Sequence, residues 1–161
     1  MKILLLGANG QLGWQLRRSL GVVGTVTALN RASAPLCGDL ARPQELASTV
    51  QAVAPDVIVN AAAYTAVDRA QSEPDAAFAI NATACAALAA AAEHCGAWLV
   101  HYSSDYVFDG SGEQPWSETD PTGPLNVYGS SKLAGEIAVA HGCERHLILR
   151  ASWVFDSWRA G

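Results

Sequence analysis

The sequence predicts an α/β fold of the Rossmann type, in which a parallel sheet is doubly wound with helices on both faces. Short apolar segments alternate with helical segments along the whole chain, and strands joined by helices of this length form parallel βαβ units with right-handed crossovers. A glycine-rich turn over residues 7–13 follows directly on the first apolar segment. That is where folds of this kind bind dinucleotides.

Five segments are predicted to be strands because they are short and either apolar or rich in β-branched residues. The first stops at Gly7, and the second begins with three β-branched residues in a row. The predicted strands are, in chain order, Lys2–Leu6, Thr25–Leu29, Asp56–Val59, Ala97–His101 and His146–Arg150.

Four segments are predicted to be helices because their apolar residues recur at helical spacing and a stop signal follows. Gly21 ends the first, and the second begins at Pro43, a residue that the first turn of a helix tolerates. The third is long and alanine-rich and ends at Gly96. The predicted helices are, in chain order, Gln11–Leu20, Pro43 to Pro55, Pro74–His94 and Asn126–His141.

Composition narrows the classes of function. The 161 residues carry a net charge of −5 without a basic block, so nucleic-acid binding is not expected. The longest apolar region, residues 78–92, is shorter than the roughly 20 residues of a membrane span, so no membrane segment is expected. The four cysteines are scattered without a C-x-x-C pair, which predicts reduced thiols in a cytoplasmic protein. The histidines lack the spacing of metal ligands, and no metal site is predicted.

The glycine turn is the first candidate functional segment. Glycine lets the backbone turn tightly and approach a pyrophosphate, whose charge faces the N–H groups at the start of the next helix. Gly7, Gly10 and Gly13 are spaced as G-x-x-G-x-x-G, which favours the short-chain reductase type of dinucleotide site. A purely structural turn is the alternative.

Tyr128 and Lys132 form the second candidate, because residues four apart lie on one face of a helix. A neighbouring ammonium lowers the pKa of a tyrosine from about 10, so that the phenol can exchange a proton at neutral pH. Ser104 and Asp105 follow the fourth predicted strand, where ligands of parallel sheets bind. The Ser104 hydroxyl could polarise a carbonyl, and a self-capping turn is the alternative.

These motifs together resemble the extended short-chain dehydrogenase/reductase superfamily and, within it, the dTDP-4-dehydrorhamnose reductase family. The resemblance covers residues 2 to about 155 and includes the segments 37–40, 55–68, 124–129 and 150–155. It implies transfer of a hydride from NAD(P)H to the 4-keto group of the nucleotide-sugar dTDP-4-dehydro-L-rhamnose, which gives dTDP-L-rhamnose. A non-catalytic NADP-binding subunit, similar to the regulatory subunit of methionine adenosyltransferase, and an inactive fragment are the alternatives.

The resemblance also implies a role for particular residues. Tyr128 would donate the proton, Lys132 would hold the nicotinamide ribose and lower the pKa of Tyr128, and Ser104 would act beside them. The substrate would contact Ser104, Asp105 and Trp153. The cofactor would contact Gly7, Gly10, Gln11, Leu12, Gly13, Asn30, Arg31, Asp39, Leu40, Ala63, Tyr64, Thr65, Tyr102, Tyr128 and Lys132. A helix-entry cap remains the alternative for Asp39, and an ordinary rim aromatic for Tyr64 and Trp153.

The sequence departs from the family in three places. Position 104 is usually threonine and here is serine. Asn30 and Arg31 stand where enzymes that accept a free 2′-hydroxyl usually carry an acidic residue, which favours NADPH over NADH. The third departure is at the end of the sequence. Residues 1–155 are predicted to form an NAD(P)-binding domain, and residues 156–161 a divergent tail in place of the family's C-terminal substrate lobe. Any Mg²⁺ would bind only through that lobe. The sequence does not decide whether the protein forms a homodimer.

Overall fold

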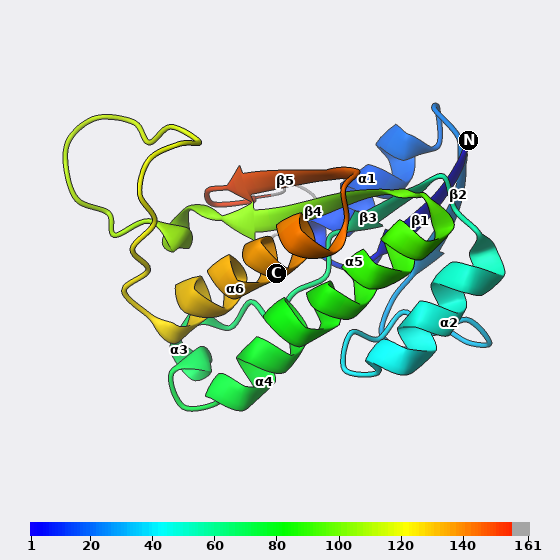
Figure 1. The fold of residues 1–161 in the computed structure, drawn as a ribbon, viewed down its shortest axis with the longest axis horizontal. Helices are drawn as coiled ribbons and strands as arrows, with labels where there is room; N and C mark the ends of the chain where they lie inside the picture. Colours follow the sequence, from blue (N-terminus) through cyan, green and yellow to red (C-terminus); the bar gives the residue numbers. More distant parts are fainter. Residues whose placement is uncertain (156–161) are drawn as a thin grey trace.

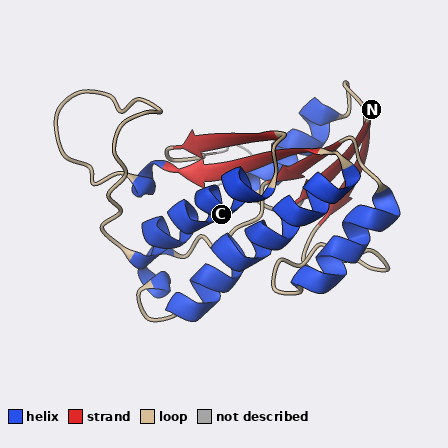
Figure 2. Cartoon of the chain, viewed as in Figure 1, coloured by secondary structure: helices blue, strands red, loops and turns tan. Residues whose placement is uncertain are grey.

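The structure, a computed structural model, describes residues 1–155, and these contain one sheet of five parallel strands (Figures 1 and 2). The strand order is β2-β1-β3-β4-β5. The predicted parallel α/β sheet is confirmed. The strands are β1 (Lys2–Leu6), β2 (Thr25–Leu29), β3 (Val57–Asn60), β4 (Trp98–Ser104) and β5 (His146–Ala151).

Helices cover both faces of the sheet (Figure 1). Helix α1 packs on β1 and β2 from one side, while α2, α5 and α6 pack side by side on the other. The doubly wound prediction is thereby confirmed. The α-helices are α1 (Gln11–Leu20), α2 (Pro43–Val53), α3 (Val67–Ala70), α4 (Pro74–Phe78), α5 (Ala84–Cys95) and α6 (Val127–Gly142), with a π-helical segment η1 (Ala79–Thr83) and a 3₁₀ turn η2 (Asp105–Val107).

Two apolar clusters, one on each face, hold the sheet between its helices. Leu4 and Leu6 of β1 are fully buried against the α2, α5 and α6 side, whereas Ile3 and Leu5 pack toward Leu16 of α1. Successive residues of a strand point to opposite faces, so an apolar strand of this kind must be covered on both sides. The continuously apolar sequence of β1 is explained by its central place in the sheet.

The chain reverses its winding direction between β1 and β3. From β1 it passes to β2 at one edge of the sheet, and it then crosses to β3 on the other side of β1. The register pairs Leu6 with both Leu29 and Asn60, so the carboxyl ends of β2, β1 and β3 lie level. A ligand crevice is expected outside the carboxyl ends of the strands at such a point.

The predicted helix over Pro74–His94 is a single helical run with a π-helical segment in its middle. This insertion brings the backbone of Asn81 so close to α6 that a Cβ added at Gly135 would lie 2.0 Å from the Asn81 carbonyl oxygen. The run Pro74–Cys95 is long and apolar enough to cross a membrane by length and composition. Many of its apolar residues, such as Leu88, pack in the core of this structure.

Other differences from the predicted elements are small. Strand β3 begins one residue later than predicted, and β4 continues to Ser104 rather than ending at His101. Neither α3 nor η2 was indicated by a sequence pattern. The predicted tail over 156–161 lies outside the described residues.

Candidate active site

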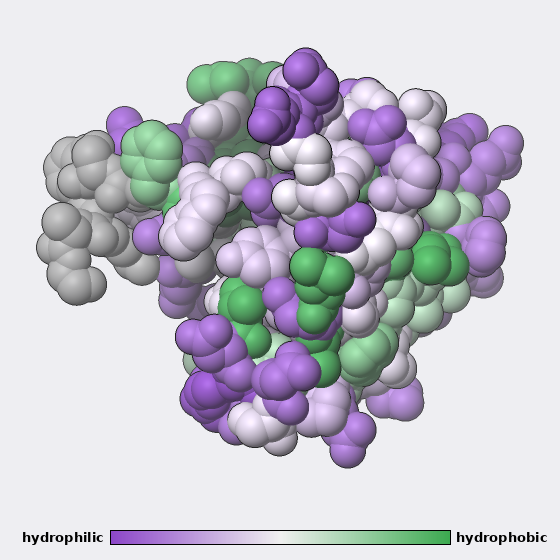
Figure 3. Space-filling model, turned by 90° about the vertical axis from the view of Figure 1, so that its left-hand side faces the viewer, coloured by the Kyte–Doolittle hydropathy of each residue, from purple (hydrophilic) through white to green (hydrophobic). Residues whose placement is uncertain are grey.

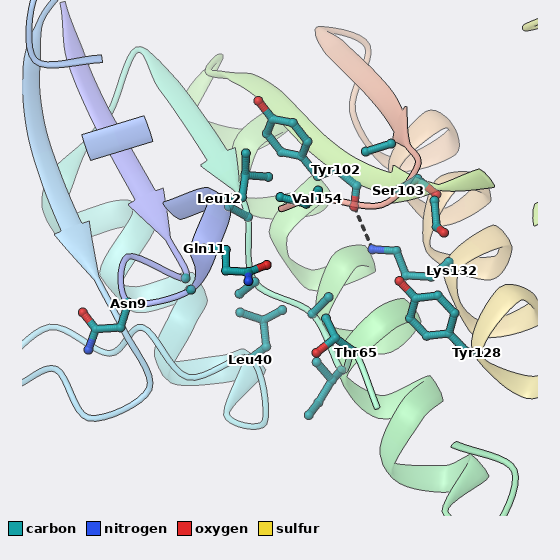
Figure 4. A pocket seen from close by; sticks show the side chains of 18 of the residues that line it. Asn9, Gln11, Leu12, Leu40, Thr65, Tyr102, Ser103, Tyr128, Lys132 and Val154 are labelled. Carbon is teal, nitrogen blue, oxygen red and sulfur yellow. Dashed lines mark hydrogen bonds between the residues drawn. The ribbon is translucent and has the colours of Figure 1, made fainter. Parts of the chain in front are cut away.

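A pocket of about 870 Å³ lies at the carboxyl ends of the strands (Figure 4). Figure 3 views the molecule from this side, where hydrophilic and hydrophobic residues are interspersed. The pocket brings together all the predicted site residues except Gly13 and Tyr64. Its lining includes Gly7, Gly10, Gln11, Leu12, Asn30, Arg31, Asp39, Leu40, Ala63, Thr65, Tyr102, Ser104, Asp105, Tyr128, Lys132 and Trp153.

The glycine turn forms one wall of the pocket by close backbone contacts. Gly7 has a φ of +80°, and a Cβ there would lie 2.7 Å from the backbone nitrogen of Ala62, two residues after β3. A Cβ at Gly13 would lie 2.0 Å from the Gly7 carbonyl oxygen, so the first turn of α1 sits directly on the turn. Gly10 precedes α1 without a side-chain cap. The first N–H groups of α1 are therefore available to an anion.

The loop after β2 closes one end of the pocket. The Asn30 side-chain oxygen accepts a hydrogen bond from Ala32 N at 2.8 Å, and this turn presents the exposed Arg31 at the pocket. Asp39 also lines the pocket while its carboxylate accepts from Ala41 N at 3.0 Å. Asp39 therefore does not act as the helix-entry cap that was the alternative: its carboxylate closes a turn before α2, whose N-cap position is Arg42 and has no side-chain cap hydrogen bond.

Lys132 and Tyr128 lie at the opposite end, on the first two turns of α6 (Figure 4). Lys132 is 2% exposed, and its Nζ donates to the carbonyl oxygen of Tyr102 at 2.7 Å. Burial lowers the pKa of Lys132. Burial is also the largest influence on the half-buried Tyr128 and raises its pKa, while the Ser104 hydroxyl lowers it. The expected lowering of the Tyr128 pKa by Lys132 is therefore wrong for this structure, because desolvation of the phenol dominates.

Ser104 and Asp105 complete this end of the pocket. The Ser104 hydroxyl donates to the Asp105 carboxylate at 3.0 Å and accepts from Tyr106 N at 3.2 Å. The Tyr106 ring meets the Tyr128 ring edge to face, with 5.6 Å between ring centroids. These contacts fix the Ser104 hydroxyl beside the Tyr128 phenol at the mouth of the pocket.

The start of α6 is set by side chains from two other segments. Asn126 caps the helix by accepting from Gly129 N at 2.7 Å, and Gln71 accepts from Val127 N at 3.2 Å. An asparagine cap of this kind stabilises a helix start. The cap fixes where α6 begins, and Tyr128 and Lys132 of its first two turns line the pocket.

Comparison with known protein families agrees with this geometry. The family model described as the RmlD substrate binding domain matches residues 1–161. The chain belongs to the RmlD substrate-binding domain family.

The relatives of this RmlD-family chain carry a consistent name. It is 57% identical over 155 residues to the dTDP-4-dehydrorhamnose reductase of Salmonella typhimurium and 55% identical to that of Escherichia coli K12. In both cases the match covers 96% of this chain and 52% of the relative. The predicted resemblance is confirmed, and the chain spans about half the length of the curated relatives it matches.

Solved structures of the same name share the fold. A dTDP-4-dehydrorhamnose reductase from Clostridium acetobutylicum superposes with a TM-score of 0.91 at 37% identity, over 98% of this chain and 55% of that one. A reductase from Bacillus anthracis, in complex with NADP, gives 0.89 at 36% identity, over 96% of this chain and 54% of that one. The Rossmann-type prediction is confirmed by these neighbours.

Two predicted residues, Tyr64 and Gly13, do not line the pocket, and a third, Trp153, lines only its rim. Tyr64 is directed toward Glu73, to which its hydroxyl donates at 2.6 Å, and it does not line the pocket. Gly13 lies on the side of α1 that packs against the Gly7 carbonyl, away from the pocket. Trp153 lies at the rim, 83% exposed, with a φ of +35° that is uncommon for a large side chain.

Asn81 is a site residue that the sequence analysis missed. It is 1% exposed in the π-helical segment, and its amide donates to the carbonyl oxygen of Tyr64 at 3.1 Å and to the Ser131 hydroxyl at 3.0 Å. It thereby joins the segment of residues 61–65 to helix α6. A lone asparagine within an alanine-rich helix was the available signal, since a buried amide requires partners.

No cluster of three or more metal-ligating side chains occurs within residues 1–155. The four histidines are spread over separate elements. His101 is buried in β4, where Asn60 lies 3.1 Å from its Nδ1, and burial lowers its pKa to about 3. It is therefore neutral at physiological pH.

Proposed function

We propose that this chain forms the cofactor-binding and catalytic half of a reductase that acts on a nucleotide-sugar. The reaction is transfer of a hydride from NADPH, with NADH as the alternative, to the 4-keto carbon of dTDP-4-dehydro-L-rhamnose. The carbonyl oxygen takes up a proton, and the product is dTDP-L-rhamnose.

One observation carries the proposal: the anion-binding turn and the Tyr128–Lys132 pair line the same pocket. Either motif alone occurs in many proteins without catalytic meaning. Their convergence at the carboxyl ends of β1, β3 and β4 gives one ligand both a diphosphate cradle and a proton donor. The names of the relatives supply the substrate class.

The residues present fit a dinucleotide. The pocket runs from Arg31 past the N–H groups of Gln11 and Leu12 to Tyr102 and Tyr128, and its volume of about 870 Å³ lies within the usual range of ligand sites. A Cβ at Gly7 would collide with the backbone of Ala61 and Ala62. Glycine at this position therefore allows the turn to lie this close to the end of β3.

The catalytic groups of the chain act on the carbonyl oxygen. A bound reduced nicotinamide supplies the hydride. Burial keeps the Tyr128 phenol protonated at neutral pH, as a proton donor requires, and its proton passes to the oxygen as the hydride arrives at carbon. Lys132, which is buried at the same end of the pocket, would hold the ribose of the nicotinamide. The Ser104 hydroxyl donates its single proton to the Asp105 carboxylate in this structure, and it would turn that proton to the carbonyl oxygen when substrate binds.

Arg31 supports the preference for NADPH. It is exposed at the end of the pocket where the adenosine ribose would lie, and no carboxylate occupies position 30. The Asn30 side chain is engaged with Ala32 N, so it holds the turn. A guanidinium in this place attracts a 2′-phosphate.

The proposal is tested in two steps on the chain itself. A fluorescence titration measures NADPH binding, and the absorbance of reduced nicotinamide is then followed after addition of dTDP-4-dehydro-L-rhamnose. The proposal expects saturable binding and formation of one dTDP-L-rhamnose for each NADPH consumed. Binding without consumption would favour the non-catalytic NADP-binding subunit, and absence of binding would overturn the cofactor site.

A further inference from the structure

Helix α6 carries a third residue on the face that holds the catalytic pair. Tyr128, Lys132 and Glu136 are each four residues apart and therefore lie in one row along the helix. The first two face the pocket, while Glu136 lies one turn further along and is 5% exposed. A buried carboxylate is stable only when it is paired.

Arg150 of β5 is the partner of Glu136. Its Nε donates to Oε1 at 3.0 Å and its Nη2 donates to Oε2 at 2.7 Å. The two-point geometry fixes the guanidinium plane more tightly than a single ammonium contact could. This ion pair therefore holds α6 against β5.

The same guanidinium also contacts an aromatic pair. Its Cζ lies 4.8 Å from the centroid of the Phe108 ring, and Phe108 stacks on Trp116 with 4.7 Å between centroids and 4° between planes. Trp116 belongs to the segment 109–125, which extends from the body of the molecule as the yellow loop in Figure 1. We call this segment the active-site loop.

The active-site loop joins the two groups that act on the substrate in the proposed reaction. It begins after Ser104–Val107 and ends at the helix cap Asn126, two residues before Tyr128. Gly123 N donates to the Val107 carbonyl at 2.9 Å and ties its base. Residues 111–119 are otherwise exposed, and the stacked Trp116 is 38% exposed.

We propose that Arg150 is a positioning residue that couples the active-site loop to the catalytic helix. One guanidinium holds the loop through Phe108 and Trp116 and holds α6 through Glu136. Docking of Trp116 then favours the helix position in which Lys132 and Tyr128 face the pocket. The function of the positioned groups rests on the proposed reductase activity, whereas the coupling itself does not.

The test uses four variants of the full chain. Trp116→Ala removes the stack, and Trp116→Phe keeps an aromatic ring as a rescue. Arg150→Lys keeps the positive charge and loses the two-point contact. Arg145→Lys is the matched control, because Arg145 directly precedes the same strand, is exposed, and its guanidinium donates to the Gly96 carbonyl rather than to a carboxylate.

Three measurements are made on each variant. Cleavage by a glutamate-specific protease after Glu113 and Glu118 reports opening of the loop, since both residues are exposed. Hydrogen exchange of the amides of residues 130–137 reports the order of α6. The dissociation constant of NADPH reports the position of Lys132 in the pocket.

The proposal expects all three to change together. In Trp116→Ala and Arg150→Lys, loop cleavage, α6 exchange and the NADPH dissociation constant rise by a factor of about three to ten. Trp116→Phe and Arg145→Lys behave as the unaltered chain does. Faster cleavage with unchanged exchange and unchanged NADPH affinity would overturn the coupling. If the unaltered chain binds no NADPH, the proposed function fails, while exchange still decides the coupling.

Discussion

The two ends of the pocket are built from different materials. At the dinucleotide end the wall is backbone: Gly7 and Gly13 lie so close to their neighbours that a single methyl group would collide with them. At the catalytic end the wall is side chains: the Lys132 amine and the Tyr128 phenol are held by burial and hydrogen bonds. An added side-chain atom at the glycine turn would therefore disrupt packing, whereas removal of a side-chain group at the other end would remove a functional group of the proposed reaction.

This difference separates stability from chemistry. The close contacts at the glycine turn are part of the fold, so substitutions there act on folding and binding together. Tyr128 is half-buried and makes an edge-to-face contact with Tyr106, which a phenylalanine preserves. Its hydroxyl can be removed without disturbing the sheet or the helix.

The largest effect is expected from Tyr128→Phe. Loss of the proton donor should lower the rate of keto-sugar reduction by about 10² to 10⁴, with unfolding midpoint and NADPH affinity near those of the unaltered chain. Tyr64→Phe is the matched control, because that hydroxyl bonds Glu73 outside the pocket. Steady-state rates and thermal melts check both. A full rate in Tyr128→Phe would break the assignment of the catalytic end.

Gly13→Ala sharpens the dinucleotide end of the comparison. The new Cβ would lie 2.0 Å from the Gly7 carbonyl oxygen, and overpacking of a rigid backbone contact costs about 3 kcal/mol of unfolding free energy. Gly96→Ala is the control: it also strains the backbone, at a φ of +69°, but its Cβ meets nothing within 4 Å, so about 1 kcal/mol is expected. Urea titrations give both values. Equal losses of unfolding free energy in the two variants would show that the contact between Gly13 and the Gly7 carbonyl adds no cost of its own.

His101 tests the buried side chains beneath the catalytic end. Its pKa of about 3 lies below the value of about 6.5 in an unfolded chain. The unfolded state then binds one more proton than the folded state between these values, so stability present above pH 6.5 is lost as the pH falls toward 3. The contribution is about 1.4 kcal/mol per pH unit. His101→Gln should remove that slope in urea titrations.

The control for this experiment is His94→Gln on the exposed end of α5. The two variants compare the same His→Gln change at a buried and at an exposed position. An identical slope in the His101 and His94 variants would mean that the imidazole of His101 titrates in the folded chain. That result would contradict the lowered pKa of His101.

Arg31→Ala is expected to have the smallest effect. Loss of one exposed contact to a 2′-phosphate should weaken NADPH binding about tenfold and leave NADH binding unchanged. Arg42→Ala serves as the control, since Arg42 pairs with Glu45 and does not line the pocket. Titrations with both nucleotides check the difference. Equal losses for NADPH and NADH would mean that Arg31 does not read the phosphate.

Much of the fold follows from local patterns. β1, α1 and β2 have the predicted bounds, because apolar runs, helical spacing and glycine stops act within a few residues. The π-helical segment at Ala79–Thr83 was not predictable in this way. It depends on the close approach of Gly135 from a helix far along the chain.

The candidate site shows the same distinction between features set by local sequence and features set by distant contacts. Residues that belong to spaced motifs, such as Gly10 and Lys132, were predicted as site residues and line the pocket. The orientation of Tyr64 was not predictable, because it depends on Glu73 and Asn81. The direction of the Tyr128 pKa was mispredicted, because a sequence shows a neighbouring charge but not how far a phenol is removed from water.

The central claim is that one dinucleotide spans both ends of the pocket. A crystal structure of the chain with NADPH tests it most directly. The account predicts the diphosphate on the N–H groups of Gln11 and Leu12, and the nicotinamide ring within about 6 Å, two hydrogen-bond lengths, of the Tyr128 hydroxyl. A nucleotide bound elsewhere, or a ring beyond that reach, would contradict it.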